Sequence, residues 1–561
     1  MKRLFTILTT LFFLVVSTLS ISAQQLTPFS RKVTGGAQDY KRTTWIKVPM
    51  ITWGADLVTV HANGDTKRTA SGSAFAGQKL KIELFREDDF VNQVSRFLKG
   101  EIVYLRGTMG MMNMAADVTE KDQRTRLVIV YQHSWSAGGD AFVVKRGIKS
   151  VKDLKGKTIA IQAYGPHVDY MTKLLSDAGL TIKDVNLVWT KDLVGPEGDT
   201  PMAKLYDKNV DAAFVIIPDA LALTSQGTVG TGAEDSARGA VIMLSTKTAS
   251  RIINDVYAVR KDYFDQNRDE VRRFVQAIMI AEEEVRDLYK AKNSRYNKML
   301  SAAAGMILDS TGATVDMEGM AFLDAEMARY DGNVKFFTDQ NYPRNFSKLN
   351  NEIQTAYIGL GLIASKVALL QGNWDYSAFT GLRYTNRVEA SRFDADKVST
   401  VVAKKSQQAT LDDSLLFSLE IFFQPNQNVF TVDMYKDDFD KVVELASTYG
   451  GAIITVEGHS DPMGFLRKEK EGASQLVLKQ IKQAAKNLSF SRANEVRKQI
   501  INYADNRGII LDPNQFASHG YGITNPKYPV PKTKQQWLDN MRVEFKIIQV
   551  EAEEDVFVPL E

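Results

Sequence analysis

The feature that most constrains this sequence is an alternation of short, β-rich apolar runs with amphipathic helical runs from residue 45 onward. Residues 79–85 alternate apolar and polar side chains, as a half-buried strand does, and residues 268–289 repeat apolar side chains with the period of a helix. Further strands are expected at 101–105, 127–131, 141–144, 158–162, 186–189 and 212–217. Strands and helices that alternate in this way predict α/β layering around a largely parallel sheet.

The pattern changes after residue 374. Residues 375–410 are rich in Ser, Thr, Asn, Asp and basic side chains and show no sustained period, which predicts a linker. Residues 411–550 carry a second set of strand and helix patterns, which predicts a separate α+β domain. A chain of 561 residues is long enough for several domains of ordinary size.

The N-terminus has the layout of a secretory signal peptide. Lys2 and Arg3 precede an apolar run over 4–19, and small residues follow up to Ala23. This order predicts cleavage near Ala23. An uncleaved membrane anchor is the alternative, but the apolar run is short for a membrane span. We expect residues 24–44 to form a loose polar segment and residues 551–561 to form an acidic tail.

Composition excludes several classes of function. The chain has no cysteine and only five histidines, none of them in metal-ligand spacing, so we expect no metal site and no cofactor. The formal net charge of +3 gives no argument for nucleic-acid binding. The sequence contains no phosphate-binding P-loop motif, no H-E-x-x-H motif and no G-x-S-x-G motif with a partnered histidine. We therefore expect a protein that is not an enzyme.

The stretch from residue 134 to residue 181 carries the first family resemblance. It contains a strand pattern, the phrase D-L-K-G-K at 153–157, a second strand pattern, a glycine-containing turn and a helix. This order resembles the type 2 periplasmic solute-binding proteins of ABC importers, especially the nitrate, sulfonate and taurine group. The resemblance implies an α/β two-lobed fold over residues 45–374, a small-molecule ligand, and an inner-membrane ABC permease as a possible partner.

In such a fold, strand ends and helix starts meet at one crevice. The candidate ligand-binding residues are Trp53, Gly54, Gly107, Thr108, Gly139, Tyr164, Gly165, His167 and Asp219. Free N–H groups at helix starts favour oxyanions, so we expect an anionic or zwitterionic ligand. Core packing is the alternative for Trp53 and Tyr164, and an ordinary helix start is the alternative for His167.

Several ordered motifs carry a second resemblance. The phrases are V-E-G-H-S-D-P-M-G at 456–464, L-S-F-S-R-A-N-E-V at 488–496, S-H-G-Y-G at 518–522 and N-M-R-V-E-F at 540–545. Together they resemble the OmpA-like peptidoglycan-binding domain. The resemblance implies a small α+β fold over residues 411–550 that binds peptidoglycan through its stem peptide.

The same resemblance implies which residues bind the wall. In that family, the aspartate after G-H-[S/T] and the arginine of R-A read the ammonium and the carboxylate of diaminopimelate; here they are Asp461 and Arg492. The family asparagine falls on Ala485, and Asn487 is the nearby candidate. The segment 465–486 is longer than the usual spacing, and we expect it to lie over or beside this site.

These observations favour a secreted periplasmic solute-binding protein, associated with the cell wall of a Gram-negative-type envelope. The N-terminal part would bind a small solute, and the C-terminal domain would hold the protein on peptidoglycan without a covalent bond. The alternative is an envelope structural or sensory protein, in which the binding-protein fold docks on a membrane complex and wall anchoring is the main role. A biosynthetic or hydrolytic enzyme on the same fold is a weaker third interpretation.

Overall fold

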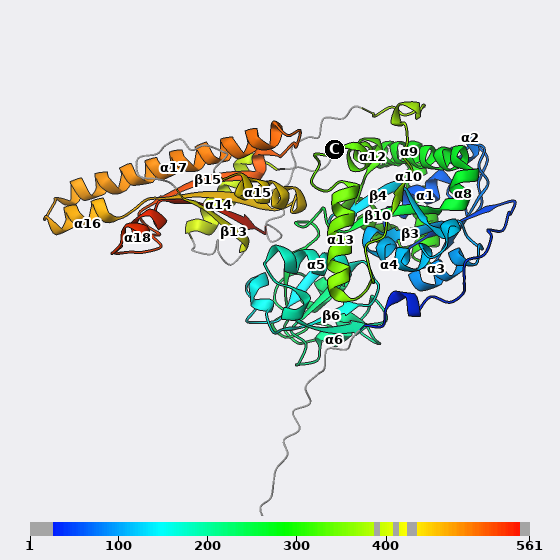
Figure 1. The fold of residues 1–561 in the computed structure, drawn as a ribbon, viewed down its shortest axis with the longest axis horizontal. Coiled ribbons are helices and arrows are strands. Elements are labelled where there is room, and N and C mark those ends of the chain that lie inside the picture. The colour runs from blue at the N-terminus through cyan, green and yellow to red at the C-terminus, as the bar shows by residue number, and fades with distance from the viewer. Residues whose placement is uncertain (1–25, 386–392, 408–414, 423–434, 550–561) are drawn as a thin grey trace, which may run out of the picture.

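The computed structural model describes residues 26–385, 393–407, 415–422 and 435–549. Two α/β lobes are built from the first of these ranges, and a smaller four-stranded domain is built from the later ones (Figure 1). The expected signal peptide at 1–23 and acidic tail at 551–561 lie outside the described residues. Within the described ranges, no helix is both long enough and apolar enough to cross a membrane.

The first lobe contains a mixed sheet in the order β11-β4-β10-β3, and its strand β10 runs antiparallel to both β3 and β4. These strands are β11 (Ala325–Met327), β4 (Leu127–Ser136), β10 (Asn254–Arg260) and β3 (Tyr104–Thr108). The parallel pair β1 (Ile46–Met50) and β2 (Ile82–Arg86) lies beside β3. Helices α1 (Asp56–Ala62), α9 (Arg268–Ala291) and α10 (Ser294–Ile307) pack together in the core of this lobe.

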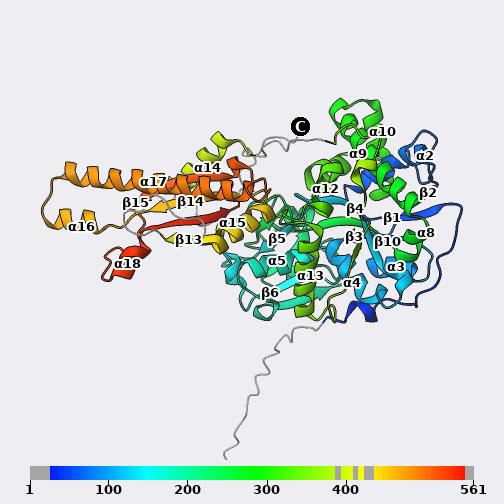
Figure 2. The same cartoon turned by 45° about the horizontal axis from the view of Figure 1, so that its top comes forward.

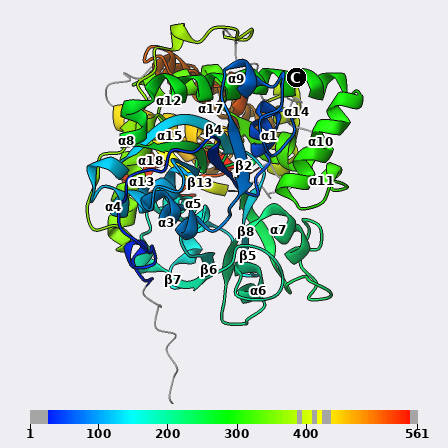
Figure 3. The same ribbon diagram turned by 90° about the vertical axis from the view of Figure 1, so that its right-hand side faces the viewer.

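The second lobe contains a five-stranded sheet in the order β7-β6-β8-β5-β9. Its strands are β7 (Asn186–Thr190), β6 (Thr158–Gln162), β8 (Ala212–Ile216), β5 (Asp140–Val144) and β9 (Val241–Ser245). Strand β6 is parallel to β7 and β8, while β5 is antiparallel to β8 and β9. Figure 3 shows this sheet below the first lobe.

The chain passes between the lobes twice, from β4 to β5 and from β9 to β10. Helix α13 (Phe346–Leu360) contacts α4 (Met109–Thr119) of the first lobe and α5 (His167–Asp177) of the second, so it bridges them. Two α/β lobes joined in this way, followed by a small α+β domain, confirm the predicted fold class. The expectation of a largely parallel sheet is wrong, because β10 is antiparallel to both of its neighbours in the first lobe and β5 is antiparallel to both of its neighbours in the second.

The C-terminal domain has a sheet in the order β13-β16-β14-β15. Its strands are β13 (Leu415–Phe422), β16 (Arg542–Ile548), β14 (Ile453–His459) and β15 (Phe516–Gly522). Helices α15 (Lys436–Thr448) and α17 (Gln475–Asp505) pack on this sheet, and α17 continues beyond it to a tip where α16 (Met463–Lys470) lies alongside (Figure 2).

The segment expected to be loose, 24–44, is packed where it is described. Phe29 is fully buried. Its ring contacts Phe90 of the first lobe and Tyr164 of the second, with centroid separations of 5.9 and 5.5 Å. The segment therefore lies across both lobes, because one aromatic side chain anchors an otherwise polar stretch.

The segment 375–410, expected to be a linker, also packs against other parts of the chain where it is described. Its first residues pack on the first lobe through Tyr376 and Phe379. Further on, α14 (Ala395–Gln407) places Val398, Val401 and Val402 against the C-terminal sheet. Two short apolar groups, too brief to show a period in the sequence, thus fix both ends of the segment.

The C-terminal domain docks on the second lobe through a buried ion network. Lys173 on α5 is nearly inaccessible to solvent. Its Nζ lies 2.9 Å from Asp177, 3.4 Å from Glu352 on α13 and 2.6 Å from Glu444 on α15. Since these partners belong to the second lobe, the bridging helix and the C-terminal domain, one ammonium group joins all three.

A glycine permits the closest approach at this interface. The Gly451 N–H donates to the Thr248 carbonyl at 3.0 Å. A Cβ at Gly451 would lie 1.9 Å from the Lys247 carbonyl oxygen, which is backbone and cannot move aside locally. Only glycine therefore fits between this domain and the second lobe.

We predict that Gly451→Ala separates the C-terminal domain from the second lobe without unfolding either, because the clash lies at the interface. Small-angle scattering should show a larger radius of gyration, and limited proteolysis should become faster between the domains. Gly464→Ala is the matched control, since a Cβ there meets nothing within 4 Å. An unchanged scattering profile for Gly451→Ala would contradict the docked arrangement.

Candidate functional site

A cavity of about 980 Å³ lies between the two lobes. This volume is ordinary for a small-molecule site. Five of the residues selected from the sequence line it: Trp53, Thr108, Gly139, Tyr164 and Gly165. They come from both lobes and from the β4–β5 crossing, as strand ends and helix starts do in an α/β crevice.

Four other selected residues are not among those that line the cavity. Gly54 and Gly107 pack internally, and a Cβ at Gly54 would lie 1.9 Å from the Met320 carbonyl oxygen. Asp219 accepts a hydrogen bond from the Gly195 N–H. His167 is fully buried behind the wall.

His167 does not contact the cavity itself but holds Asp140, which does. Its Nε2 lies 2.7 Å from Oδ1 of Asp140, which does line the cavity. Ser136 donates to the other oxygen of Asp140 at 2.6 Å. His167 therefore fixes the orientation of a carboxylate at the cavity wall.

Two of the helix starts near the cavity, those of α4 and α5, are partly closed to a ligand. The Thr108 hydroxyl accepts from the Met111 N–H at 3.2 Å and so caps α4 with its own side chain. Helix α5 begins after Pro166, which has no N–H to donate. These two starts therefore offer fewer free donors to an oxyanion than the sequence implied.

A buried ion network lies behind the cavity. Arg106 on β3 donates to Asp56 at 2.9 Å and to Asp255 at 2.6 Å, and all three side chains are buried. Burial raises the pKa of both carboxyl groups, that of Asp56 to about 7, and the guanidinium partly offsets the increase. The network joins β3, α1 and β10.

The same network orients the aromatic wall. The indole N–H of Trp53 donates to Ser134 Oγ at 3.0 Å, and Ser134 donates to Asp255 at 3.3 Å. Asp255 is held in turn by Arg106. The Trp53 ring is therefore positioned by a chain of hydrogen bonds that ends at a buried guanidinium.

Sequence reasoning missed two acidic residues of the wall, Asp255 and Asp324. Asp140, Asp255 and Asp324 all line the cavity. Asp140 follows the selected Gly139 directly, so its position was a usable signal. Asp255 and Asp324 come from later segments, β10 and the turn before β11, and only the folded chain brings them to the crossing between the lobes.

In the C-terminal domain, Asp461 lies two residues after the end of β14. Its carboxylate accepts from the Met463 N–H at 2.9 Å and from Asn540 Nδ2 at 3.3 Å. Partial burial raises its pKa, and these hydrogen bonds oppose the increase. Asp461 is thus held in place at the edge of the sheet.

Arg492 lies on α17 and is almost fully buried. Burial lowers its pKa, so a carboxylate partner would stabilise its charged form. Helix α17 crosses the end of β14. Ser460 Oγ donates to the Ala485 carbonyl at 3.2 Å, and Gly458 packs against the backbone of Ser489. Asp461 and Arg492 therefore both belong to the region where α17 packs on β14.

Asn487 is exposed, and its side chain accepts a hydrogen bond from Gln483 at 2.8 Å. It precedes Arg492 by five residues, a spacing that places the two on different faces of a helix. The inserted segment 465–486 forms most of α16 and the first part of α17. Near its end, the Ala485 carbonyl accepts a hydrogen bond from Ser460, the residue before Asp461.

Comparisons with known proteins agree with these two parts. Residues 80–286 match the family model described as "NMT1/THI5 like". A search of curated proteins finds the outer membrane protein Omp38 of Acinetobacter baumannii, 29% identical over 175 residues. That match covers 30% of this chain and 42% of the relative, so less than half of the relative's length is represented here.

Among solved structures, a putative periplasmic sulfonate-binding protein from Methylobacillus flagellatus KT has a TM-score of 0.39 at 18% identity, covering 61% of this chain and 94% of its own. The periplasmic nitrate-binding protein NrtA from Synechocystis PCC 6803 has a TM-score of 0.38 at 13% identity, covering 62% and 88%.

These matches support a chain that joins a type 2 binding-protein fold to an OmpA-like domain. This confirms the predicted fusion. The family model covers β5 to β9 of the second lobe together with parts of the first.

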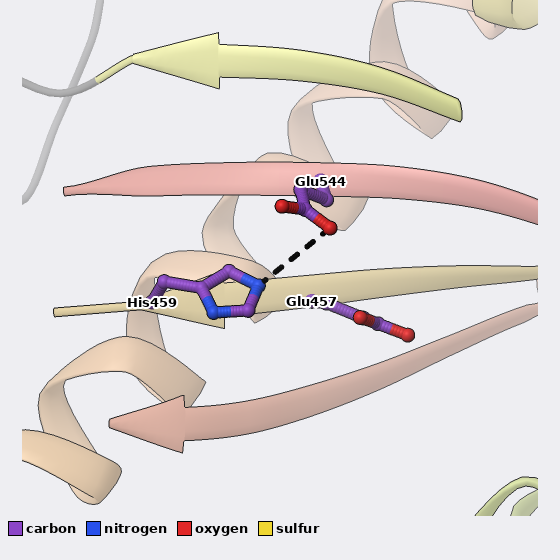
Figure 4. A group of neighbouring side chains, drawn as sticks. All are labelled: Glu457, His459 and Glu544. Atoms are coloured by element: carbon purple, nitrogen blue, oxygen red, sulfur yellow. Dashed lines mark ion pairs between the residues drawn. The ribbon is translucent and has the colours of Figure 1, made fainter. Parts of the chain in front are cut away.

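One group in the OmpA-like domain has the composition of a metal site. Ligand atoms of Glu457, His459 and Glu544 lie within 4.8 Å of one another. His459 and Glu544 face each other at 3.9 Å (Figure 4). However, Lys546 Nζ lies 3.0 Å from Glu457, and Arg542 Nε lies 2.5 Å from Glu544.

These two cations already balance the carboxylates of the group. Burial, Arg542 and Lys546 also lower the pKa of His459 to about 3, so its ring stays neutral. The group is therefore best explained as a buried ion-pair network that supports the sheet.

The stability of the two-lobed part tests the role of the buried network around Arg106. Arg106→Ala leaves two buried carboxylates without their cation, and we predict a loss of about 3–5 kcal/mol in the free energy of unfolding. Urea unfolding of the mature chain measures this. Arg124→Ala should cost far less, because Arg124 and its partners Asp39 and Asp122 are solvent-accessible. Equal effects of the two substitutions would contradict the role of Arg106.

Proposed function

We propose that this protein is a periplasmic solute-binding protein that is held on the cell wall. Its two lobes bind a small molecule in the cavity between them. Its OmpA-like domain binds the diaminopimelate-containing stem peptide of peptidoglycan without a covalent bond. An inner-membrane ABC permease is the partner that would receive the solute.

The observation that carries the solute-binding part is the cavity of about 980 Å³ at the double crossing between the lobes. Lobes connected by two short crossings can open and close around a ligand as rigid bodies. The Trp53 and Tyr164 rings supply apolar contact area, and buried polar groups supply orientation. The sequence-based expectation of an anionic or zwitterionic ligand remains a prediction.

Native mass spectrometry of mature protein purified without denaturation tests this part. We expect a bound small molecule whose mass is lost when the protein is unfolded. A protein that carries no small molecule and binds none from a metabolite panel would favour the alternative in which the fold docks on a membrane complex.

The wall-binding part is supported by Asp461 and Arg492. Asp461 is held by backbone and amide donors, and the charge of the buried Arg492 would be stabilised by an incoming carboxylate. A carboxylate and a guanidinium can pair with the ammonium and the carboxylate at one end of diaminopimelate. Asn487, which lies on another face of α17, is a weaker candidate in this proposal.

We predict that Asp461→Asn and Arg492→Ala each reduce retention on diaminopimelate-type sacculi at least tenfold. Each substitution leaves one ligand charge unmatched, and a loss of about 1.4 kcal/mol corresponds to a factor of ten. Co-sedimentation of the mature chain with purified sacculi measures the retention.

Arg467→Ala is the matched control, because Arg467 is an exposed arginine on the neighbouring α16. It removes the same charge without touching the proposed site, and we expect little change. Circular dichroism should show that all three variants remain folded. Wild-type retention by both site variants would mean that the domain keeps its fold but not this ligand.

A further inference from the structure

The charge of the cavity wall is unevenly distributed. Its basic lining residues are Lys32 and Lys191, which are both exposed. Its buried lining includes Asp140 and Asp255, which are 4% and 3% exposed, and Asp324 lies beside them. A ligand that reaches the back of the cavity therefore meets carboxylates rather than ammonium groups.

The basic groups behind the wall are already paired. Arg106 is held between Asp56 and Asp255, and His167 contacts Asp140 at 2.7 Å. Neither projects a free donor into the cavity, because neither is among the residues that line it. An anion at this depth would find no unpaired cation among the described lining residues.

Asp324 differs from the other two carboxylates. Among the described residues, no basic side chain forms an ion pair with it within 4 Å, whereas Asp255 has Arg106 and Asp140 has His167. Asp324 lies on the crossing between the lobes: a Cβ at Gly138 would be 3.3 Å from its Oδ1. Its charge is thus the least compensated of these three carboxylates.

An aromatic ring lies beside this carboxylate. A Cβ at Gly139 would lie 2.6 Å from the Trp53 ring and 3.3 Å from Asp324 Cβ, so both side chains meet over one glycine. The Trp53 N–H is used by Ser134, so the group that Trp53 offers to the cavity is its ring. A carboxylate next to an indole ring matches an organic cation, which is attracted by both.

We propose that the cavity binds a small organic cation, with its ammonium or protonated nitrogen at the Asp324 carboxylate and its apolar body along Trp53. This inference rests on the proposed solute-binding function and names its ligand class. A zwitterion would satisfy it through its ammonium end, so the proposal agrees with the zwitterionic ligand expected from the sequence and departs from the anionic one.

Because the Asp324 carboxyl group can be neutral or ionised, the proposal predicts that affinity for a cation depends on pH. Burial and the neighbouring Asp140 raise the pKa of Asp324 to about 7, and Lys247 partly opposes the increase. A cation binds the ionised carboxylate, so affinity should rise as the pH increases through 7. Asp140 faces Asp324 from β5 and is paired with His167, and Lys247 follows β9.

Calorimetry with three probes that share one ring tests the proposal on the mature chain: benzylammonium, benzyl alcohol and benzenesulfonate. We expect benzylammonium to bind at least tenfold more tightly than the other two, and more tightly at pH 8 than at pH 6. Asp324→Asn should lower benzylammonium affinity at least tenfold, abolish its pH dependence and leave benzyl alcohol unchanged. Asp192→Asn, at an exposed acid of the cavity rim, is the control and should have little effect.

The outcomes distinguish the cation assignment from solute binding itself. Tightest binding of benzenesulfonate, or equal binding of the three probes, would overturn the cation assignment while solute binding stands. Absence of binding by every probe, together with no small molecule retained in native mass spectrometry, would overturn both. If Asp324→Asn fails to fold, the pH dependence of wild-type affinity decides alone: a flat profile between pH 6 and 8 overturns the assignment.

Discussion

A buried guanidinium shared by two carboxylates organises the binding-protein part of this chain. Arg106 joins β3 to α1 through Asp56 and to β10 through Asp255. Asp255 accepts from Ser134, which accepts from the Trp53 indole. The orientation of the aromatic wall therefore depends on this pairing. So does the absence of an available cation among the described residues at the back of the cavity.

The sequence predicted the fold through its periodicity. Residues 158–162 form β6 as expected, and the amphipathic run from 268 extends as α9 to Ala291. The stretches 24–44 and 375–410 could not be predicted in the same way. Each is fixed by one or a few apolar side chains, Phe29 in the first and the valines of α14 in the second, and such sparse contacts leave no period to detect.

The candidate site could be predicted only in part, for a related reason. Trp53, Gly139 and Tyr164 follow strands, so their positions on the cavity wall could be inferred from local pattern. Asp324 could not, because it is brought to Gly138 by the return of the chain from α11 (Thr314–Gly319) and has no local motif. The charge of the cavity is therefore a property of the tertiary structure.

The OmpA-like domain contacts helix α5, which also reaches the cavity. Helix α5 begins next to the lining residues Gly165 and Pro166, and on the same helix Lys173 pairs with Glu444 of the C-terminal domain. Helix α13 shares this contact through Glu352. The OmpA-like domain thus lies against α5 of the second lobe and against α13, which bridges the two lobes. In the proposed function, the wall-binding domain and the solute cavity therefore share helix α5.

The central claim is that one chain carries a solute while it is attached to the wall. The most direct measurement is native mass spectrometry of the mature protein after it has been bound to sacculi, washed, and released with soluble stem peptide. The account predicts that the protein sediments with the sacculi and that the released chain retains one small molecule. A chain that stays in the supernatant, or that leaves the sacculi without any bound small molecule, would contradict it.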